Sequence, residues 1–210
     1  MRHIPPRAVT TIEDGTNFVQ WYTDGSIIHG KSPILARSGW AAFVAQDDQH
    51  NVSRMLHGQS QSTYRAELRA VLHVVRYTDI HVIIRSDCKS VVTTANAIVQ
   101  GDGKTLDDIA SGNISEADLW QQLVFEITQS THRQVKCRWM PAHFDDQEPQ
   151  GEEGKVKQAS PEAELKRQAQ VAKMHKYIEE GVVTKQDIIN NKEVDRSAKL
   201  PPIITSPRSR

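Results

Sequence analysis

The order of hydrophobic and polar residues changes its period along the chain. Between residues 19 and 24, Val19, Trp21 and Thr23 alternate with more polar positions, and this period of two predicts a strand that ends at the turn Asp24-Gly25-Ser26. Similar runs at 39–45 and near 52–58 predict two more strands, with a polar break at 46–49 between them. The first part of the chain is therefore expected to form an antiparallel three-stranded meander.

After residue 60 the spacing becomes helical. Leu68, Val71, Leu72 and Val75 predict a helix that Ser62 or Thr63 would cap. The β-branched run 81–85 predicts a buried parallel strand, followed by a helix at 89–99, a break at 101–113, a helix at 115–130 and a strand at 135–140. This order predicts an α/β fold, a mixed five-stranded sheet flanked by helices.

The composition becomes strongly polar at 144–159, where loop or disorder is expected. Ser160-Pro161-Glu162 then begins a helix expected to run to about Glu180, with few apolar residues, and a last helix is expected from Thr184 to about Leu200. We therefore expect a polar lead-in at 1–16, one domain at 17–200, and a loose basic tail at 201–210.

Charge and cysteine content narrow the classes of function only slightly. The chain has 26 basic and 26 acidic residues, so its bulk charge does not indicate a nucleic-acid partner. Its two cysteines, Cys88 and Cys137, form no metal-type pair and suggest a reducing compartment. Because no segment has the apolar core of a signal peptide or the length of a membrane span, we expect an intracellular protein, in the nucleus or cytoplasm, without a membrane partner.

Three carboxylates occupy positions where chemistry is expected. Asp24 ends the first strand, Asp87 follows the buried strand, and Glu67 lies early in a helix. Each taken singly is more simply a turn residue, a helix cap or a solvated acid. Brought together they would repel one another and raise one another's pKa, unless divalent cations neutralised them. The set therefore predicts a site for Mg²⁺, which prefers oxygen ligands.

Five segments carry a resemblance to a known family. They are Tyr22–Ser26, Tyr64–Leu68, Arg85–Cys88, Asp118–Leu123 and Val135–His143. In this order they resemble the ribonuclease H family, and in particular the ribonuclease H domains of retroelement reverse transcriptases. The resemblance covers about residues 17–143 and implies the ribonuclease H-like sheet.

The family has a fourth carboxylate soon after its catalytic histidine. Asn191-Lys192-Glu193-Val194-Asp195 fits the family's last motif, although Lys192 stands where the family has Glu. The resemblance thus implies that Asp195 is the fourth ligand and that residues 144–183 are an insertion. Asp145 and Asp146, directly after His143, are the alternative ligands, and Asp195 could also be a plain surface acid.

The resemblance also implies roles and cofactors. Asp24 would bridge two Mg²⁺ ions, with Mn²⁺ as a substitute. Glu67 and Asp87 would complete one metal site and Asp195 the other. His143 would shuttle a proton or assist product release, although a lone histidine after a proline is more often a loop residue.

The substrate implied by the resemblance is an RNA–DNA hybrid, whose RNA strand would be cut to leave 5′-phosphate and 3′-hydroxyl ends. A fused or associated reverse transcriptase is the implied protein partner. Gly25 and Ser26 are placed to contact RNA, and Ser62 and Thr63 to contact a DNA phosphate at a helix N-terminus, or they serve simply as caps.

The basic protrusion with which some family members grip the hybrid is missing, because residues 101–113 contain Lys104 but three aspartates. Lys166, Arg167, Lys173 and Lys176 of the insertion helix could replace it, although a solvated charged face is the favoured interpretation.

Two other functions stay open. One is a catalytically inactive module that binds nucleic acid or has a structural role, against which the intact carboxylate set argues. The other is a DNA-cutting nuclease of the same fold, but the acidic pattern differs from such enzymes and no zinc-type His/Cys module precedes the domain.

Overall fold

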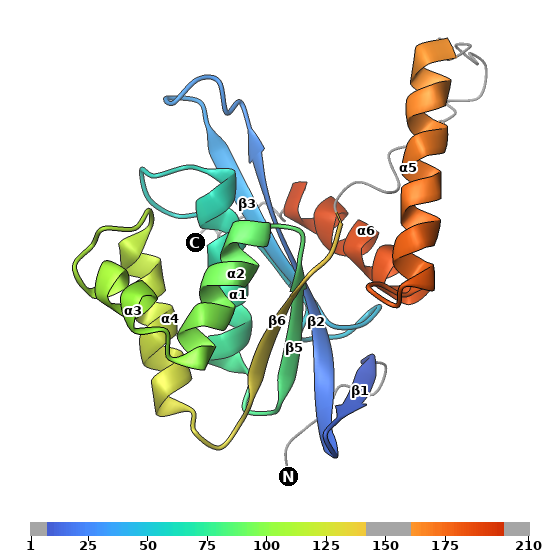
Figure 1. Ribbon diagram of the computed structural model, residues 1–210. Helices are drawn as coiled ribbons and strands as arrows, with labels where there is room; N and C mark the ends of the chain where they lie inside the picture. Colours follow the sequence, from blue (N-terminus) through green and yellow to red (C-terminus); the bar gives the residue numbers. More distant parts are fainter. Residues whose placement is uncertain (1–7, 142–160, 200–210) are drawn as a thin grey trace, which may run out of the picture.

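The computed structural model describes residues 8–141 and 161–199. Its sheet has the strand order β4-β3-β2-β5-β6, with β1 paired to the start of β2 (Figure 1). The strands are β1 (Thr10–Glu13), β2 (Thr16–Ile28), β3 (Arg37–Phe43), β4 (Val52–Met55), β5 (Val82–Ser86) and β6 (Val135–Trp139). β1 to β4 pair in antiparallel fashion, whereas β2, β5 and β6 are parallel, so the predicted mixed sheet is confirmed.

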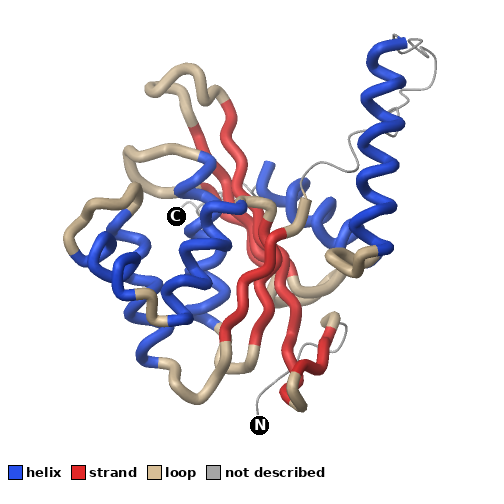
Figure 2. The backbone as a smooth tube through the Cα atoms, viewed as in Figure 1, coloured by secondary structure: helices blue, strands red, loops and turns tan. Residues whose placement is uncertain are grey.

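Helices cover both faces of this sheet (Figure 2). They are α1 (Thr63–Tyr77), α2 (Lys89–Gln100), α3 (Gly103–Ala110), α4 (Ala117–Gln129), α5 (Pro161–Glu179) and α6 (Lys185–Lys199). α1, α2 and α4 pack on one face around a core that includes Leu68, Leu72 and Trp120. α6 packs on the other face, where Val194 and Ala198 meet Tyr22 of β2. β2 is therefore covered by helices on both faces.

Most of α5 extends away from the sheet in Figure 1, and its described side chains are exposed or half-buried. An edge-to-face contact between Trp139 and Tyr177, with ring centroids 6.0 Å apart, joins its second half to β6. None of the helices that the structure describes is long and apolar enough to cross a membrane.

Four sequence expectations need correction. The first strand does not end at a turn Asp24-Gly25-Ser26, because β2 stays paired with β3 as far as Ile28. The lead-in 1–16 contains β1, which is only four residues long and therefore too short to show a clear period. The break at 101–113 contains α3, because Asp102 caps that helix by accepting a hydrogen bond from the Thr105 amide at 3.0 Å. The third strand ends at Met55 rather than near residue 58.

Candidate active site

The site forms where β5 ends beside the longer β2. The last pair between these parallel strands joins Thr23 to Ser86, after which β2 continues with β3 alone. Asp24 is therefore the first residue of β2 beyond the end of β5, and Asp87 is the residue that follows β5. Sites in open α/β sheets occur at such carboxyl ends of parallel strands.

Glu67 reaches the same place from α1 because the helix lies directly against β2. A Cβ atom at Gly25 would lie 2.4 Å from the Glu67 amide nitrogen and 2.8 Å from the Ala66 carbonyl carbon. Only glycine permits this approach, since backbone atoms cannot give way as a flexible side chain can. The glycine after Asp24 thus allows Glu67 of α1 to lie beside Asp24 of β2.

The three predicted carboxylates come together in the structure. One oxygen of each of Asp24, Glu67 and Asp87 lies within 4.8 Å of the others. Asp24 is 6% exposed and Glu67 is 4% exposed, so little water screens their charges. The group has the size and the ligand type that a divalent cation requires.

Burial makes this cluster electrostatically unfavourable on its own. Desolvation, followed by the charges of Asp87 and Asp195, raises the pKa of Asp24 to about 8. Desolvation, followed by the charges of Asp24 and Asp87, likewise raises the pKa of Glu67 well above its usual range. Asp24 Oδ2 is buried without a hydrogen-bond partner among the residues described. A cation would satisfy this oxygen and offset the repulsion.

Neutral groups fix the backbone around the cluster. The Ser86 hydroxyl accepts a hydrogen bond from the Cys88 amide at 3.1 Å and lies 3.5 Å from Glu67 Oε2. The Trp139 indole donates to the Asp87 carbonyl oxygen at 3.0 Å. These contacts hold the segment after β5 in place without adding a positive charge to the carboxylates.

Asp195 of α6 lies near the cluster but outside the group of three. Its charge is the third cause of the raised pKa of Asp24, so the two carboxylates interact. Its Oδ2 accepts from Lys199 Nζ at 2.7 Å, one helical turn away. The structure therefore brings Asp195 close to Asp24 although the two are far apart in sequence, and its role as a metal ligand stays a prediction. His143, Asp145 and Asp146 lie outside the described residues.

The predicted substrate-binding residues have structural partners of their own. Ser26 donates to the Ala198 carbonyl oxygen at 2.7 Å and so ties β2 to the end of α6. Ser62 caps α1 by accepting from the Arg65 amide at 3.0 Å, which confirms one of the two predicted caps. Thr63, the first residue of α1, is exposed. Their contacts with nucleic acid stay predictions, as does any role of Gly25 beyond the close approach.

Sequence reasoning missed a buried polar network that anchors α6. Asp187 Oδ1 accepts from the Tyr22 hydroxyl at 2.7 Å and lies 3.1 Å from Arg85 Nε. Arg85 Nε also donates to Gln20 Oε1 at 2.7 Å. The signal that could have indicated it is the Thr184-x-x-Asp187 spacing, which in the structure is a reciprocal cap: Thr184 N donates to Asp187 Oδ2 and Asp187 N donates to Thr184 Oγ1.

Comparison with known proteins agrees with this geometry. Residues 16–159, more than half of the chain, match the family model described as RNase H. The chain belongs to the RNase H family. Its central strand, the Glu67 helix and the segment after β5 all lie within the match, whereas Asp195 and α6 lie outside it.

Individual relatives are more distant. The chain is 29% identical over 130 residues to a protein named Ribonuclease H from Schizosaccharomyces pombe, a match that covers 60% of this chain and 46% of the relative. The chain therefore spans less than half of that relative's length.

Among solved structures, the native protease-reverse transcriptase of prototype foamy virus is 14% identical, with a TM-score of 0.48, covering 85% of this chain and 20% of the viral one. The foamy viral enzyme in complex with an RNA/DNA hybrid is 18% identical, with a TM-score of 0.43, covering 59% of this chain and 17% of the viral one. The family assignment rests on the sequence match, not on these structures.

Proposed function

We propose that this RNase H-family chain is an endonuclease that hydrolyses the RNA strand of RNA–DNA hybrids and leaves 5′-phosphate and 3′-hydroxyl ends. The observation that carries the proposal is the set of three carboxylates within 4.8 Å, in which Asp24 Oδ2 is buried without a partner. A buried cluster of carboxylates destabilises the fold, and such costly arrangements occur mainly at functional sites.

The residues fit divalent metal ions. Asp24, Glu67 and Asp87 offer only oxygen ligands, which Mg²⁺ prefers and which Mn²⁺ also accepts, and Asp195 would add a fourth carboxylate for a second ion. Two such ions, when bound, supply an activated water and stabilise the charge that develops at the phosphate.

The protein contributes to the reaction by holding the carboxylates in fixed positions. β2 and α1 hold Asp24 and Glu67 rigidly through the contact at Gly25, and the Ser86 and Trp139 hydrogen bonds hold the backbone of Asp87. Carboxylates fixed in this way need no rearrangement when the reaction begins. The Gly25-Ser26 segment continues β2 past the cluster and would lie beside the ribose of the cut strand, whose 2′-hydroxyl distinguishes RNA from DNA. Proton transfer by His143 and association with a reverse transcriptase stay predictions.

The test uses a hybrid with separately labelled strands. With Mg²⁺ we expect cleavage of the RNA strand only, 5′-phosphate products, and loss of at least 100-fold in rate in Asp87→Asn, an order of magnitude typical of a lost electrostatic contact to the reacting centre. Asp107→Asn, an exposed aspartate of α3, is the matched control and should cut normally. Normal cleavage by Asp87→Asn, or cutting of the DNA strand, would refute the proposal.

A further inference from the structure

A second charged feature lies along α1 and borders the core residues Trp40, Leu56 and Leu119. A cavity of about 230 Å³ opens between the edge strand β4, α1 and α4. Its lining includes Arg54 of β4, the α1 residues Arg65, Arg69 and Arg76, and Trp40 of β3. We call this cavity the arginine groove. A chain with no net charge therefore gathers four arginines around one small cavity.

Two of these arginines are neutralised and two are not. Arg65 pairs with Glu116 and Asp118, reaching Asp118 through hydrogen bonds of 2.8 and 2.6 Å, and Arg76 pairs with Glu126 at 2.6 Å. Within the described part of the chain, no ion pair joins Arg54 or Arg69 to a carboxylate. The groove thus holds positive charge that the fold itself leaves uncompensated.

Arg69 shows this most clearly. Its guanidinium lies over the Trp40 ring, 5.1 Å from the centroid, and its Nη1 is buried without a hydrogen-bond partner among the described residues. Burial, followed by the charge of Arg76, lowers the pKa of Arg69, and Arg54 adds to the effect. A buried donor without an acceptor is destabilising, so an anion in the groove would relieve both the repulsion and the unmade hydrogen bond.

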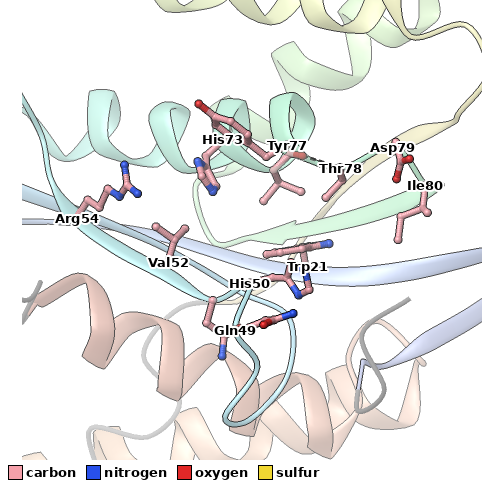
Figure 3. Close-up of a pocket in the computed structure, with 12 residues that line it drawn as sticks. Trp21, Gln49, His50, Val52, Arg54, His73, Tyr77, Thr78, Asp79 and Ile80 are labelled. Carbon is pink, nitrogen blue, oxygen red and sulfur yellow. Dashed lines mark hydrogen bonds between the residues drawn. The ribbon is translucent and has the colours of Figure 1, made fainter. Parts of the chain in front are cut away.

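Aromatic rings lie next to the arginines. His73 lies 5.0 Å from the Trp40 ring and 4.6 Å from the Tyr77 ring, measured between centroids. Burial, followed by the charges of Arg69 and Arg54, lowers the pKa of His73 to about 4, so the imidazole is neutral at pH 7 and adds no charge. Figure 3 shows Arg54 extending from β4 toward α1 beside His73 and Tyr77, in the neighbouring cleft of about 600 Å³ that shares Arg54 with the groove.

We propose that the arginine groove binds backbone phosphates of a nucleic acid. The proposal rests on the proposed function for its ligand, the RNA–DNA hybrid. Guanidinium groups suit phosphate because they donate two parallel hydrogen bonds to it. Arg54 and Arg69, the two arginines without an ion pair among the described residues, border the groove from β4 and α1, so a polyanion can contact both. Arg65 and Arg69 also flank Glu67 in sequence, so one helix would carry both the metal site and the grip on the substrate.

The test measures hybrid binding at several salt concentrations in EDTA, with Arg54→Glu as the main variant. Arg54 is exposed on β4, and the introduced glutamate can pair with Arg69, so the variant should fold at least as stably as the wild type. We expect binding to weaken roughly ten-fold at low salt and the slope of log K against log salt to fall by about 1, the change for one lost phosphate contact. Arg69→Gln should lower the slope by a similar amount.

Arg138→Glu controls for the change of charge, because Arg138 lies on β6, the other edge strand of the sheet, where it pairs with Glu13. It should change binding less than two-fold. With Mg²⁺, Arg54→Glu should raise KM for the hybrid and leave kcat unchanged, because Arg54 does not touch the reacting phosphate. Equal losses in Arg54→Glu and Arg138→Glu, with equal slopes, would overturn the proposal.

Two further outcomes separate the sources of phosphate and the two proposals. Inorganic phosphate could raise the Tm of the wild type but not of Arg54→Glu, while Arg54→Glu leaves the salt dependence of hybrid binding unchanged. This result would overturn the proposal, because the ligand would then be a small phosphate compound. A wild type that binds the hybrid with the expected dependence on Arg54 but does not cut it would support the groove and refute the endonuclease.

Discussion

Asp24 and Asp187 are both buried aspartates beside β2, yet their surroundings are opposite. Asp187 is 1% exposed, and its two oxygens accept from Tyr22, the Thr184 amide and the Thr184 hydroxyl, with Arg85 beside them. Asp24 is 6% exposed, has one oxygen without a partner, and faces the charges of Asp87 and Asp195. A buried aspartate whose oxygens all have hydrogen-bond donors thus stabilises the fold, whereas one that lacks a donor and faces other carboxylates indicates a metal or catalytic site.

The two aspartates are linked through α6. Asp187 lies in the first turn of this helix, and Asp195 follows eight residues later, about 12 Å along the axis. Burial, followed by the charge of Asp187, raises the pKa of Tyr22, so its hydroxyl stays protonated and keeps donating. The hydrogen bonds of Asp187 therefore hold α6 in place, and with it the position of Asp195 near the three carboxylates.

The largest effect on stability is expected when the hydrogen-bonded network around Asp187 is broken. Asp187→Ala leaves Arg85 buried without its carboxylate and should lower the free energy of unfolding by about 3–5 kcal/mol. Urea denaturation would measure the loss. Asp195→Asn, at a half-buried position, is the control and should cost less than about 1 kcal/mol. If Asp187→Ala were no worse than this control, Asp187 would not anchor α6.

Gly25→Ala is expected to have the next largest effect, because it disturbs the unsatisfied cluster through packing alone. The added methyl group would meet the α1 backbone, so β2 and α1 must separate at a cost of about 1–3 kcal/mol. The free energy of unfolding, measured by chemical denaturation, and the cleavage rate should both fall. The matched control is Gly103→Ala, because a Cβ at Gly103 meets nothing within 4 Å and the residue has no positive φ. An active, fully stable Gly25→Ala would show that the contact does not set the site.

The effect of Asp24→Asn should depend on pH in a defined direction. The pKa of Asp24 is about 8 in the folded protein and 3.8 as its ordinary value, so between these pH values the folded state holds a proton that the unfolded chain has lost. The metal-free wild type should therefore lose stability as pH rises from about 4 to 8.

Asp24→Asn should reduce this slope and gain about 1–2 kcal/mol over the wild type at pH 8 in EDTA, which thermal unfolding at pH 5 and pH 8 would measure. A wild type whose stability rises over this pH range would contradict the raised pKa. Asp187→Asn serves as the contrast, since it should destabilise the protein at both pH values by removing the negative charge that pairs with the buried Arg85.

The smallest effect is expected at the ion pair between Lys199 and Asp195. This pair is partly exposed and spans one helical turn, so Lys199→Ala should change the free energy of unfolding by only about 0.3–0.5 kcal/mol. Salt-dependent thermal unfolding would detect it. A loss above about 2 kcal/mol would mean that Lys199, rather than the Asp187 network, holds the end of α6.

The sequence predicted the features that depend on local pattern. The strand that carries Asp24 and the helix that carries Glu67 show a clear period, and the β-branched run before Asp87 indicates a buried strand, so each carboxylate could be assigned to its element. It could not predict the burial of Asp187, because an acid in the first turn of a polar helix looks solvated until the helix docks on Tyr22 and Arg85, about 100 or more residues earlier. The arginine groove was missed for the same reason, since Arg54 and Arg69 meet only through tertiary packing.

Anomalous diffraction from crystals grown at pH 8 with Mn²⁺ tests most directly whether the unsatisfied carboxylates form a metal site. We predict a strong peak within coordination distance of Asp24 and at least one of Glu67 and Asp87, with Asp195 facing a second peak that shares Asp24. Asp187 should contact no metal. Crystals that hold Mn²⁺ elsewhere but show no peak at Asp24 would mean that these carboxylates do not form a metal site.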